Sequence, residues 1–170
     1  MPKQLLIMRH AKSSWDDDSM TDHERPLNPR GLRDAPRMAQ FLNANNLVPD
    51  LIVSSDANRA RSTAKLVSEH LNNTELQVEF TEEFYLAAPD VYLEYAQRLS
   101  DQYERPMFIG HNPGMEVLVN SLGDGKSQSM PTAAIAVAVF EFDMWKKLAD
   151  APAVRSLSVF RPKQIDDFNA

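Results

Sequence analysis

The sequence of 170 residues contains no cysteine. This absence excludes a disulfide framework, a thiolate-bound metal and a cysteine nucleophile. Long apolar runs are missing as well: no stretch approaches the roughly 20 apolar residues that span a bilayer, and the residues before Arg9 are too few for a signal peptide. Basic residues are outnumbered, because 18 Lys and Arg stand against 24 Asp and Glu for a net charge of −6. We therefore expect a cytoplasmic protein whose partners include neither a membrane nor a nucleic acid.

The composition is typical of one globular domain. Hydrophobic residues make up 43% of the chain and charged residues 25%, and a chain of this length can bury a sizeable core. No internal repeat or low-complexity segment divides it. We expect a single domain over residues 1–170, in which residues 162–170 form a polar tail.

Apolar runs alternate with segments of helical periodicity. Strands are expected at residues 5–8, 51–53, 76–80, 107–109, 134–142 and 154–160. Helices are expected from Asn28 to Leu42, from Asp56 to Leu71, from Pro89 to Tyr103, from Asn112 to Leu122, and over residues 145–148. Asn28 and Asp56 are the predicted N-caps. The alternation predicts an α/β fold with three layers, in which a mostly parallel sheet is flanked by helices on both faces.

Histidine and arginine residues follow three of these predicted strands. Arg9 and His10 follow the first strand, Arg59 and Arg61 follow the second, and His111 follows the fourth. In a doubly wound sheet, ligands bind outside the carboxyl ends of the strands, so these side chains would meet at one edge. Guanidinium groups match phosphate oxygens, and a neutral imidazole is a nucleophile toward phosphorus. The pattern therefore indicates a site for phosphoryl chemistry.

Each of these residues alone has a simpler interpretation as a surface cation or a polar residue at a strand end. Their joint placement favours the site. His23 and His70 have no such setting, and we expect both on the surface. The sequence has no His-Glu-x-x-His pair or other compact metal-ligand spacing, no dinucleotide or Walker-type glycine loop and no Gly-x-Ser-x-Gly elbow. Metal, nucleotide and serine-hydrolase sites therefore lack support.

Five segments taken together resemble the histidine phosphatase superfamily, also called phosphoglycerate mutase-like. They are Arg9-His10-Ala11, Arg25-Pro26-Leu27-Asn28-Pro29-Arg30-Gly31, residues 54–64, Gly110-His111-Asn112-Pro113-Gly114 and residues 130–134. Ala11 stands where the superfamily has glycine, and this replacement is similar to the branch of small bacterial phosphohistidine phosphatases typified by SixA. The resemblance implies a phosphoglycerate mutase-like histidine phosphatase domain over nearly the whole chain, with no metal and no organic cofactor.

The resemblance also implies a role for each residue of the predicted site. His10 would be the nucleophile that becomes phosphorylated. Arg9 and Arg59 would bind the phosphoryl oxygens. His111 would hydrogen-bond the same group and stabilise charge in the transition state.

Several acidic residues of this sequence are candidates for the proton donor of the superfamily. Many relatives carry a glutamate after the third strand that protonates the leaving group. Glu83 is the predicted donor here, Glu82 is the alternative, and Asp16 to Asp18 are less suited. Asp16 stands where many relatives have asparagine, and we do not assign it to binding because a carboxylate repels phosphate.

The lack of a single clearly matched proton donor bears on the identity of the substrate. An alkoxide leaving group needs a proton in the transition state, whereas a phosphorylated imidazole leaves more easily, since imidazolium has a pKa of about 6.5. About eight residues, 72–79, separate the second helix from the end of the third strand, which leaves no room for a cap. We predict a phosphatase that forms a covalent phosphohistidine intermediate and acts on phosphohistidine in a protein. Two alternatives stay open: a phosphatase of small phosphomonoesters, and a non-catalytic module that binds phosphate or phosphoproteins.

Overall fold

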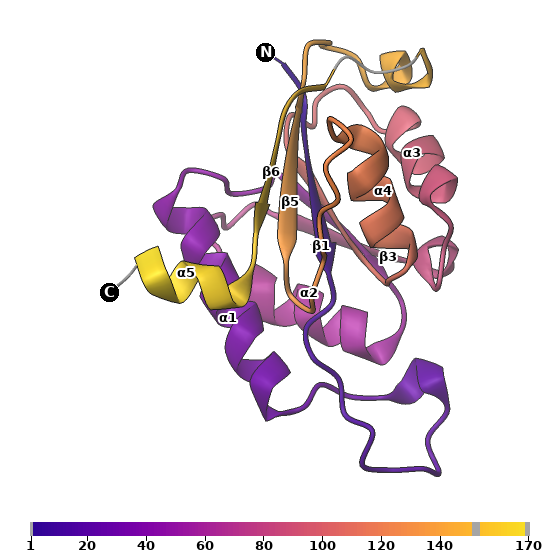
Figure 1. Cartoon of the computed structure of the whole chain (residues 1–170), viewed down its shortest axis with the longest axis vertical. Coiled ribbons are helices and arrows are strands. Elements are labelled where there is room, and N and C mark those ends of the chain that lie inside the picture. Colours follow the sequence, from indigo (N-terminus) through magenta and orange to yellow (C-terminus); the bar gives the residue numbers. More distant parts are fainter. Residues whose placement is uncertain (1, 151–153, 169–170) are drawn as a thin grey trace.

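The described residues form a six-stranded sheet in the order β3-β2-β4-β1-β5-β6 (Figure 1). The computed structural model describes residues 2–150 and 154–168. The strands are β1 Gln4–Arg9, β2 Leu51–Ser55, β3 Gln77–Thr81, β4 Pro106–Gly110, β5 Ile135–Phe140 and β6 Val154–Phe160. The α-helices are α1 Pro29–Ala44, α2 Asn58–His70, α3 Pro89–Gln97, α4 Gly114–Leu122 and α5 Pro162–Phe168. Short 3-10 helices are η1 Asp22–Glu24, η2 Glu82–Phe84 and η3 Trp145–Ala149. No helix within these ranges is long and apolar enough to cross a membrane.

The strands that precede the predicted site residues run parallel. β4 pairs in parallel with β1 and with β2, and β2 pairs in parallel with β3, whereas β5 is antiparallel to both β1 and β6. The register places Arg9 at the end of β1 beside Gly110 at the end of β4, and Ser54 of β2 beside Ile109. The segments that follow these three strands therefore start from one edge of the sheet. The predicted α/β class with helices on both faces is confirmed, and the sheet is mixed because β5 runs opposite to the other five strands.

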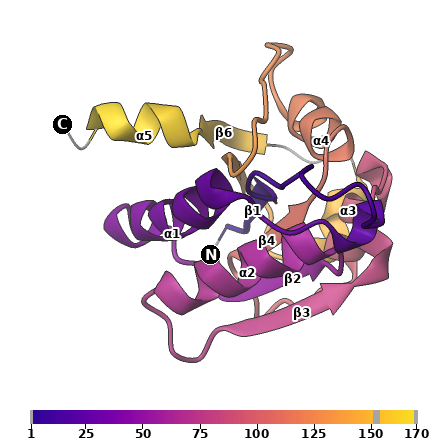
Figure 2. The same ribbon diagram turned by 90° about the horizontal axis from the view of Figure 1, so that it is seen from below.

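β1 lies at the centre of the sheet and is buried on both faces. Leu5 and Ile7 pack with residues of α3, α4 and η3, while Leu6 and Met8 pack with residues of α1, α2 and α5. Figure 2 shows α1 on the opposite side of the molecule from α3 and α4. Because burial of each large apolar side chain contributes about 1.5–3 kcal/mol, an all-apolar run is stable only in such a doubly covered position.

The starts of α1 and α2 show one N-cap prediction confirmed and one wrong. Asn28 is the N-cap of α1, and its Oδ1 accepts a hydrogen bond from the Gly31 N–H at 2.9 Å. Asp56 was predicted to cap α2, but Ala57 is the N-cap and makes no side-chain cap bond. The Asp56 carboxylate instead accepts from His23 Nε2 at 3.0 Å, so an ion-pairing partner far along the chain holds it away from the helix.

Two predicted segments end differently in the structure. The helix predicted as far as Tyr103 ends at Gln97. Residues 162–168, predicted as part of a polar tail, form the short helix α5, and its Ile165 is 2% exposed in the cluster that includes α1. The two large apolar residues of this polar segment, Ile165 and Phe168, are too few to give a periodic signal, which is why the sequence pattern did not indicate this helix. Residues 169–170 lie outside the described residues.

Candidate active site

A cavity of about 240 Å³ lies at the carboxyl ends of β1, β2 and β4. In Figure 1 this is the lower end of β1, where the chain continues into the segment that carries η1, and Figure 2 views the molecule from that side. The residues that line the cavity are Arg9, His10, Lys12, Ser13, Trp15, Asp22, Arg25, Arg59, Leu86, His111, Asn112 and Thr132. The structure thus brings together both histidines and both arginines that the sequence analysis placed at one site.

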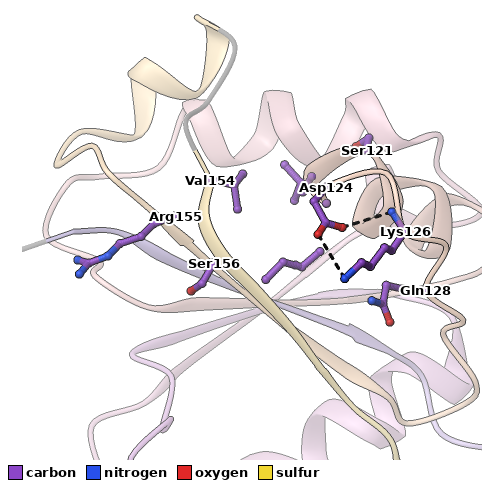
Figure 3. A pocket seen from close by; sticks show the side chains of 10 residues that line it. Ser121, Asp124, Lys126, Gln128, Val154, Arg155 and Ser156 are labelled. Atoms are coloured by element: carbon purple, nitrogen blue, oxygen red, sulfur yellow. Dashed lines mark hydrogen bonds and ion pairs between the residues drawn. The ribbon is translucent and has the colours of Figure 1, made fainter.

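A larger cavity, of about 670 Å³, lies between the loop after α4 and strand β6 (Figure 3). Its lining, as far as the structure describes it, contains no histidine. Two of the charged residues there are paired with each other, because Asp124 accepts a hydrogen bond from the Lys126 backbone N–H at 3.3 Å and pairs with its Nζ at 3.9 Å. The smaller cavity is therefore the candidate active site.

His10 is buried with a defined ring orientation. Its Nδ1 lies 2.7 Å from the Ala11 carbonyl oxygen, and a carbonyl oxygen only accepts, so Nδ1 carries the proton. The Nε2 lone pair is then free to attack an electrophile. Burial, followed by the nearby His111 ring and the charges of Arg59 and Arg9, lowers the pKa of His10 to about 3. The ring is therefore neutral and nucleophilic at neutral pH.

His111 lies against His10, with the two ring centroids 5.1 Å apart. Its Nε2 is 2.7 Å from Ser55 Oγ, and this hydroxyl oxygen also accepts a hydrogen bond from the Ala57 N–H at 3.2 Å. When the Ser55 hydroxyl donates to Nε2, the Nδ1 of His111 carries the proton. Burial, followed by the charge of Arg59, lowers the pKa of His111 to about 3. His111 is therefore neutral, and in this tautomer its Nδ1 is a hydrogen-bond donor.

Three buried nitrogen atoms of the site have no hydrogen-bond partner among the described residues. They are Arg9 Nε, Arg59 Nε and His111 Nδ1. An unpaired buried donor costs about 1–3 kcal/mol, and native proteins leave few of them without a partner or a ligand. Two of the three belong to guanidinium groups. The arrangement is suited to a compact anion that offers several acceptor oxygens, as a phosphoryl group does.

Arg59, in the first turn of α2, is held by Asp22 of η1. Nη1 donates to the Asp22 carbonyl oxygen at 2.7 Å and Nη2 donates to the Asp22 carboxylate at 3.0 Å. The Tyr85 hydroxyl donates to the same carboxylate at 2.6 Å. Burial raises the pKa of Asp22, but the Tyr85 hydrogen bond and the Arg59 charge outweigh it and lower the pKa to about 2. Asp22 is therefore an ionised carboxylate in the lining of the cavity, next to the donors suited to a phosphoryl group.

The sequence model of the histidine phosphatase superfamily (branch 1) matches residues 5–86. An uncharacterized chloroplastic protein of Arabidopsis thaliana is 37% identical over 153 residues, which cover 85% of this chain and 70% of that protein. The chain belongs to the histidine phosphatase superfamily.

Solved structures support the same superfamily. The crystal structure of an Agrobacterium tumefaciens protein assigned as the phosphohistidine phosphatase SixA has a TM-score of 0.76 and 25% identity, and the match covers 93% of this chain and 98% of that chain. The protein histidine phosphatase SixA complexed with tungstate has the same fold, with a TM-score of 0.78 at 23% identity over 95% of this chain and 99% of that chain. The predicted superfamily and its phosphoglycerate mutase-like fold are confirmed.

Several sequence-predicted residues lie away from the cavity. Glu83, the predicted proton donor, and its alternative Glu82 are not among the described residues that line it. The Glu83 carboxylate accepts from Arg98 Nη2 at 2.9 Å in an exposed ion pair. Asp16 to Asp18 are exposed and also outside the lining. Arg61 lies over the Phe80 ring at 4.1 Å. The structure therefore places Arg9 and Arg59 together at the cavity, and it places Arg61 and the predicted acids elsewhere.

Three polar residues of this superfamily site were missed by the sequence analysis. Asp22 holds Arg59, and Ser55 holds His111. Thr63 Oγ1 accepts from the Ala11 N–H at 3.0 Å and donates to the Arg59 carbonyl oxygen at 2.7 Å, so it ties the loop after β1 to α2. The sequence signal for Ser55 and Thr63 was their position in the segment of residues 54–64. Asp22 carried no comparable signal, because it acts across 37 positions of the chain.

Proposed function

We propose that this histidine phosphatase domain, over residues 1–170, hydrolyses phosphohistidine on a protein through a phosphorylated His10. The observation that carries the proposal is the free Nε2 of a neutral His10 beside three buried, unpaired N–H donors. A nucleophile is needed only for turnover, since a phosphate-binding module requires the donors alone.

In the first step, His10 Nε2 attacks phosphorus and the bond from phosphorus to the substrate nitrogen breaks. Arg9, Arg59 and His111 donate to the phosphoryl oxygens as charge spreads over them. A phosphohistidine whose other ring nitrogen carries a proton leaves as neutral imidazole, so this step requires no separate proton donor. The phosphorylated His10 keeps the proton on Nδ1, which continues to donate to the Ala11 carbonyl oxygen.

In the second step, water attacks phosphorus and His10 leaves as neutral imidazole. The Nδ1 proton that it kept makes this departure possible without a further acid. The protons of the attacking water end on the phosphate product and on solvent. His10 returns to its starting tautomer, ready for another cycle.

The acids near the cavity favour phosphohistidine over alkyl phosphate esters. Asp22 is the carboxylate among the described lining residues, and its pKa of about 2 keeps it without a proton at neutral pH. The Glu83 carboxylate is held by Arg98 outside the lining. An alkoxide leaving group would find no carboxylic acid among the described lining residues to protonate it, and such a group requires a proton in the transition state.

The size and the rim of the cavity favour a protein substrate. A volume of about 240 Å³ lies below the roughly 300–1,000 Å³ of typical small-ligand pockets. Two of its lining side chains, Trp15 and Leu86, are large and apolar, and they are 68% and 57% exposed. Exposed apolar side chains around a site are suited to contact with another protein. The cavity then takes the phosphorylated imidazole while the rest of the substrate stays outside.

A trapping experiment tests the reaction. Protein incubated with a phosphohistidine-bearing protein and quenched under mild conditions should carry a phosphoryl group on His10, and His10→Ala should carry none. The phosphohistidine protein should be hydrolysed far faster than p-nitrophenyl phosphate or a sugar phosphate.

Two outcomes would replace the proposal. A large preference for the small esters would make the protein a small-molecule phosphatase. Absence of turnover on every substrate, with phosphate binding retained in His10→Ala, would make it a phosphate- or phosphoprotein-binding module.

A further inference from the structure

The orientation of Arg59 is fixed from outside the reacting groups. Both of its terminal nitrogens donate to Asp22, one to the backbone carbonyl oxygen at 2.7 Å and one to the carboxylate at 3.0 Å. The Arg59 side chain is only 3% exposed. A planar guanidinium held at two points cannot rotate in its plane. Nε is then the one nitrogen of this group that has no partner among the described residues, and its N–H is free to donate to a ligand.

Asp22 is itself held by three groups. Its Oδ2 accepts from the Tyr85 hydroxyl at 2.6 Å as well as from Arg59. Its Oδ1 accepts from Arg25 Nε at 3.2 Å and lies 3.1 Å from Arg25 Nη2. Arg25 in turn donates to Ser13 Oγ at 2.7 Å. With each oxygen engaged twice, the carboxylate has no vacant acceptor direction for a substrate proton.

We propose that Asp22 is a positioning residue that fixes the Arg59 guanidinium with its Nε–H toward the phosphoryl group. The proposal rests on the proposed function for the identity of the ligand, but the anion-binding geometry that it describes requires no turnover. Asp22 acts through Arg59, whereas a proton donor would act on the leaving group.

The ionisation of Asp22 separates these two roles. Its pKa is lowered to about 2, because the Tyr85 hydrogen bond and the Arg59 charge outweigh the effect of burial. A carboxylate that stays ionised provides a constant charge for Arg59 and no proton for a leaving group. Loss of Asp22 should therefore weaken the binding of any phosphoryl oxyanion, whatever leaving group it carries.

The test measures inorganic phosphate affinity by calorimetry for wild type, Asp22→Asn, Asp22→Ala and Tyr85→Phe. Both Asp22 variants should bind phosphate about tenfold more weakly or worse, since they lose a charge-assisted hydrogen bond to Arg59. Tyr85→Phe should lose less, because it leaves the contacts between Arg59 and Asp22 in place. Asp56→Asn is the matched control: it neutralises a nearby carboxylate that pairs with His23 outside the cavity lining, and its affinity should stay within about twofold.

A second readout compares p-nitrophenyl phosphate with phenyl phosphate, whose leaving group is more basic. If Asp22 positions Arg59, both esters lose the same factor in kcat/KM in Asp22→Asn. A loss confined to phenyl phosphate would identify Asp22 as a proton donor and overturn the proposal. Phosphate affinity that is unchanged or tighter in both Asp22 variants, with thermal unfolding showing that they are folded, would overturn it too.

The two readouts also separate this proposal from the proposed function. If wild-type protein forms no phosphorylated His10 but binds phosphate in an Asp22-dependent way, the positioning role stands and the phosphatase assignment fails. If turnover is normal and phosphate affinity does not depend on Asp22, the reverse holds.

Discussion

In His10 and in His111, one ring nitrogen is hydrogen-bonded to another residue of the protein, and the other ring nitrogen is available to the phosphoryl group. A carbonyl oxygen of Ala11 fixes the proton of His10, and the Ser55 hydroxyl engages His111. Burial keeps both rings neutral, with pKa values lowered to about 3. The positive charge that a phosphoryl group requires therefore comes from arginines, which remain charged when buried. This division lets one imidazole attack phosphorus while the neighbouring imidazole donates a hydrogen bond.

Replacing Ser55 by alanine should weaken the hydrogen bond that His111 offers to the phosphoryl group. The Nε2 of His111 would lose its partner, and the ring could turn its protonated nitrogen away from the cavity. A lost hydrogen bond of this kind is worth about 1 kcal/mol, so phosphorylation of His10 should slow by about five- to tenfold in a single-turnover measurement. Ser54→Ala is the matched control, because Ser54 is equally buried and its hydroxyl bonds the Ser55 carbonyl oxygen instead. Equal rates for the two variants would contradict the role given to Ser55.

The individual site residues at the strand ends could be predicted from the sequence, but the side chains that form hydrogen bonds and ion pairs with them could not. Arg9, His10 and His111 directly follow buried strands, and the parallel direction of those strands brings them to one edge. Asp22 and Glu83 show the limit. Glu83 follows a predicted strand and Asp22 lies in a polar segment without a predicted element, yet Asp22 pairs with Arg59 and Glu83 pairs with Arg98. Side-chain direction in a loop depends on such distant partners, which no local pattern encodes.

The elements around the site are joined by a close contact between α1 and the loop after β1. The Lys12 carbonyl oxygen accepts from the Asn28 N–H at 3.0 Å, and Ser13 pairs with Leu27 in an isolated β-bridge. Together they close the base of the segment that carries η1 and Asp22. A Cβ atom at Gly31 would lie 2.2 Å from the same Lys12 oxygen. Glycine at this position therefore allows the helix to approach the lining of the cavity.

The Gly31→Ala variant tests whether the close contact with the Lys12 carbonyl oxygen outweighs the higher helix propensity of alanine. Propensity alone would stabilise α1 by about 1 kcal/mol, whereas overpacking against a backbone atom costs about 1–3 kcal/mol. We expect a net loss in the free energy of unfolding, together with weaker phosphate binding, because the loop with Lys12 must move. Leu32→Ala, at an exposed neighbouring position of α1, should change neither by a comparable amount. A more stable Gly31→Ala variant with unchanged phosphate affinity would contradict this account. Chemical denaturation and calorimetry measure the two quantities.

Helices and strands with a strong apolar pattern could be predicted from the sequence. Features that depend on a single tertiary contact could not. The apolar runs that became β1, β2 and β4 and the periodic faces of α1 and α2 were apparent in the sequence. Helix α5 packs against the rest of the protein through the buried Ile165. The predicted cap at Asp56 failed because His23, an exposed residue in the sequence prediction, pairs with it. In both cases a single tertiary contact outweighed local preference.

At the scale of the whole molecule, an acidic protein carries a cationic cavity. The net charge is −6, while Arg9, Lys12, Arg25 and Arg59 all line the cavity. Charge at the site is therefore opposite in sign to the mean charge, and the net value alone did not indicate an anionic ligand. The direction of β5 and β6 was equally hidden, because alternation along a strand carries no information on whether its neighbour is parallel. The edge where the site lies is formed by the parallel strands, so this did not affect its prediction.

The buried neutral histidines should make the stability of the whole protein depend on pH. His10 faces His111, Arg59 and Arg9, and His111 also faces Asp22 and His23; the pKa of each of the two buried rings is about 3 in the folded protein, against about 6.5 in an unfolded chain. Above pH 6.5 both states leave these rings neutral. Below it the unfolded state binds protons that the folded state does not, so the free energy of unfolding falls with pH by up to about 1.4 kcal/mol per pH unit for each histidine. Urea denaturation at pH 7.5, 6.0 and 5.0 should show this slope in wild type and a shallower one in the double variant His10→Gln, His111→Gln. Identical slopes would mean that the folded rings take up protons over the same pH range as the unfolded ones, and this would contradict the lowered pKa values of His10 and His111.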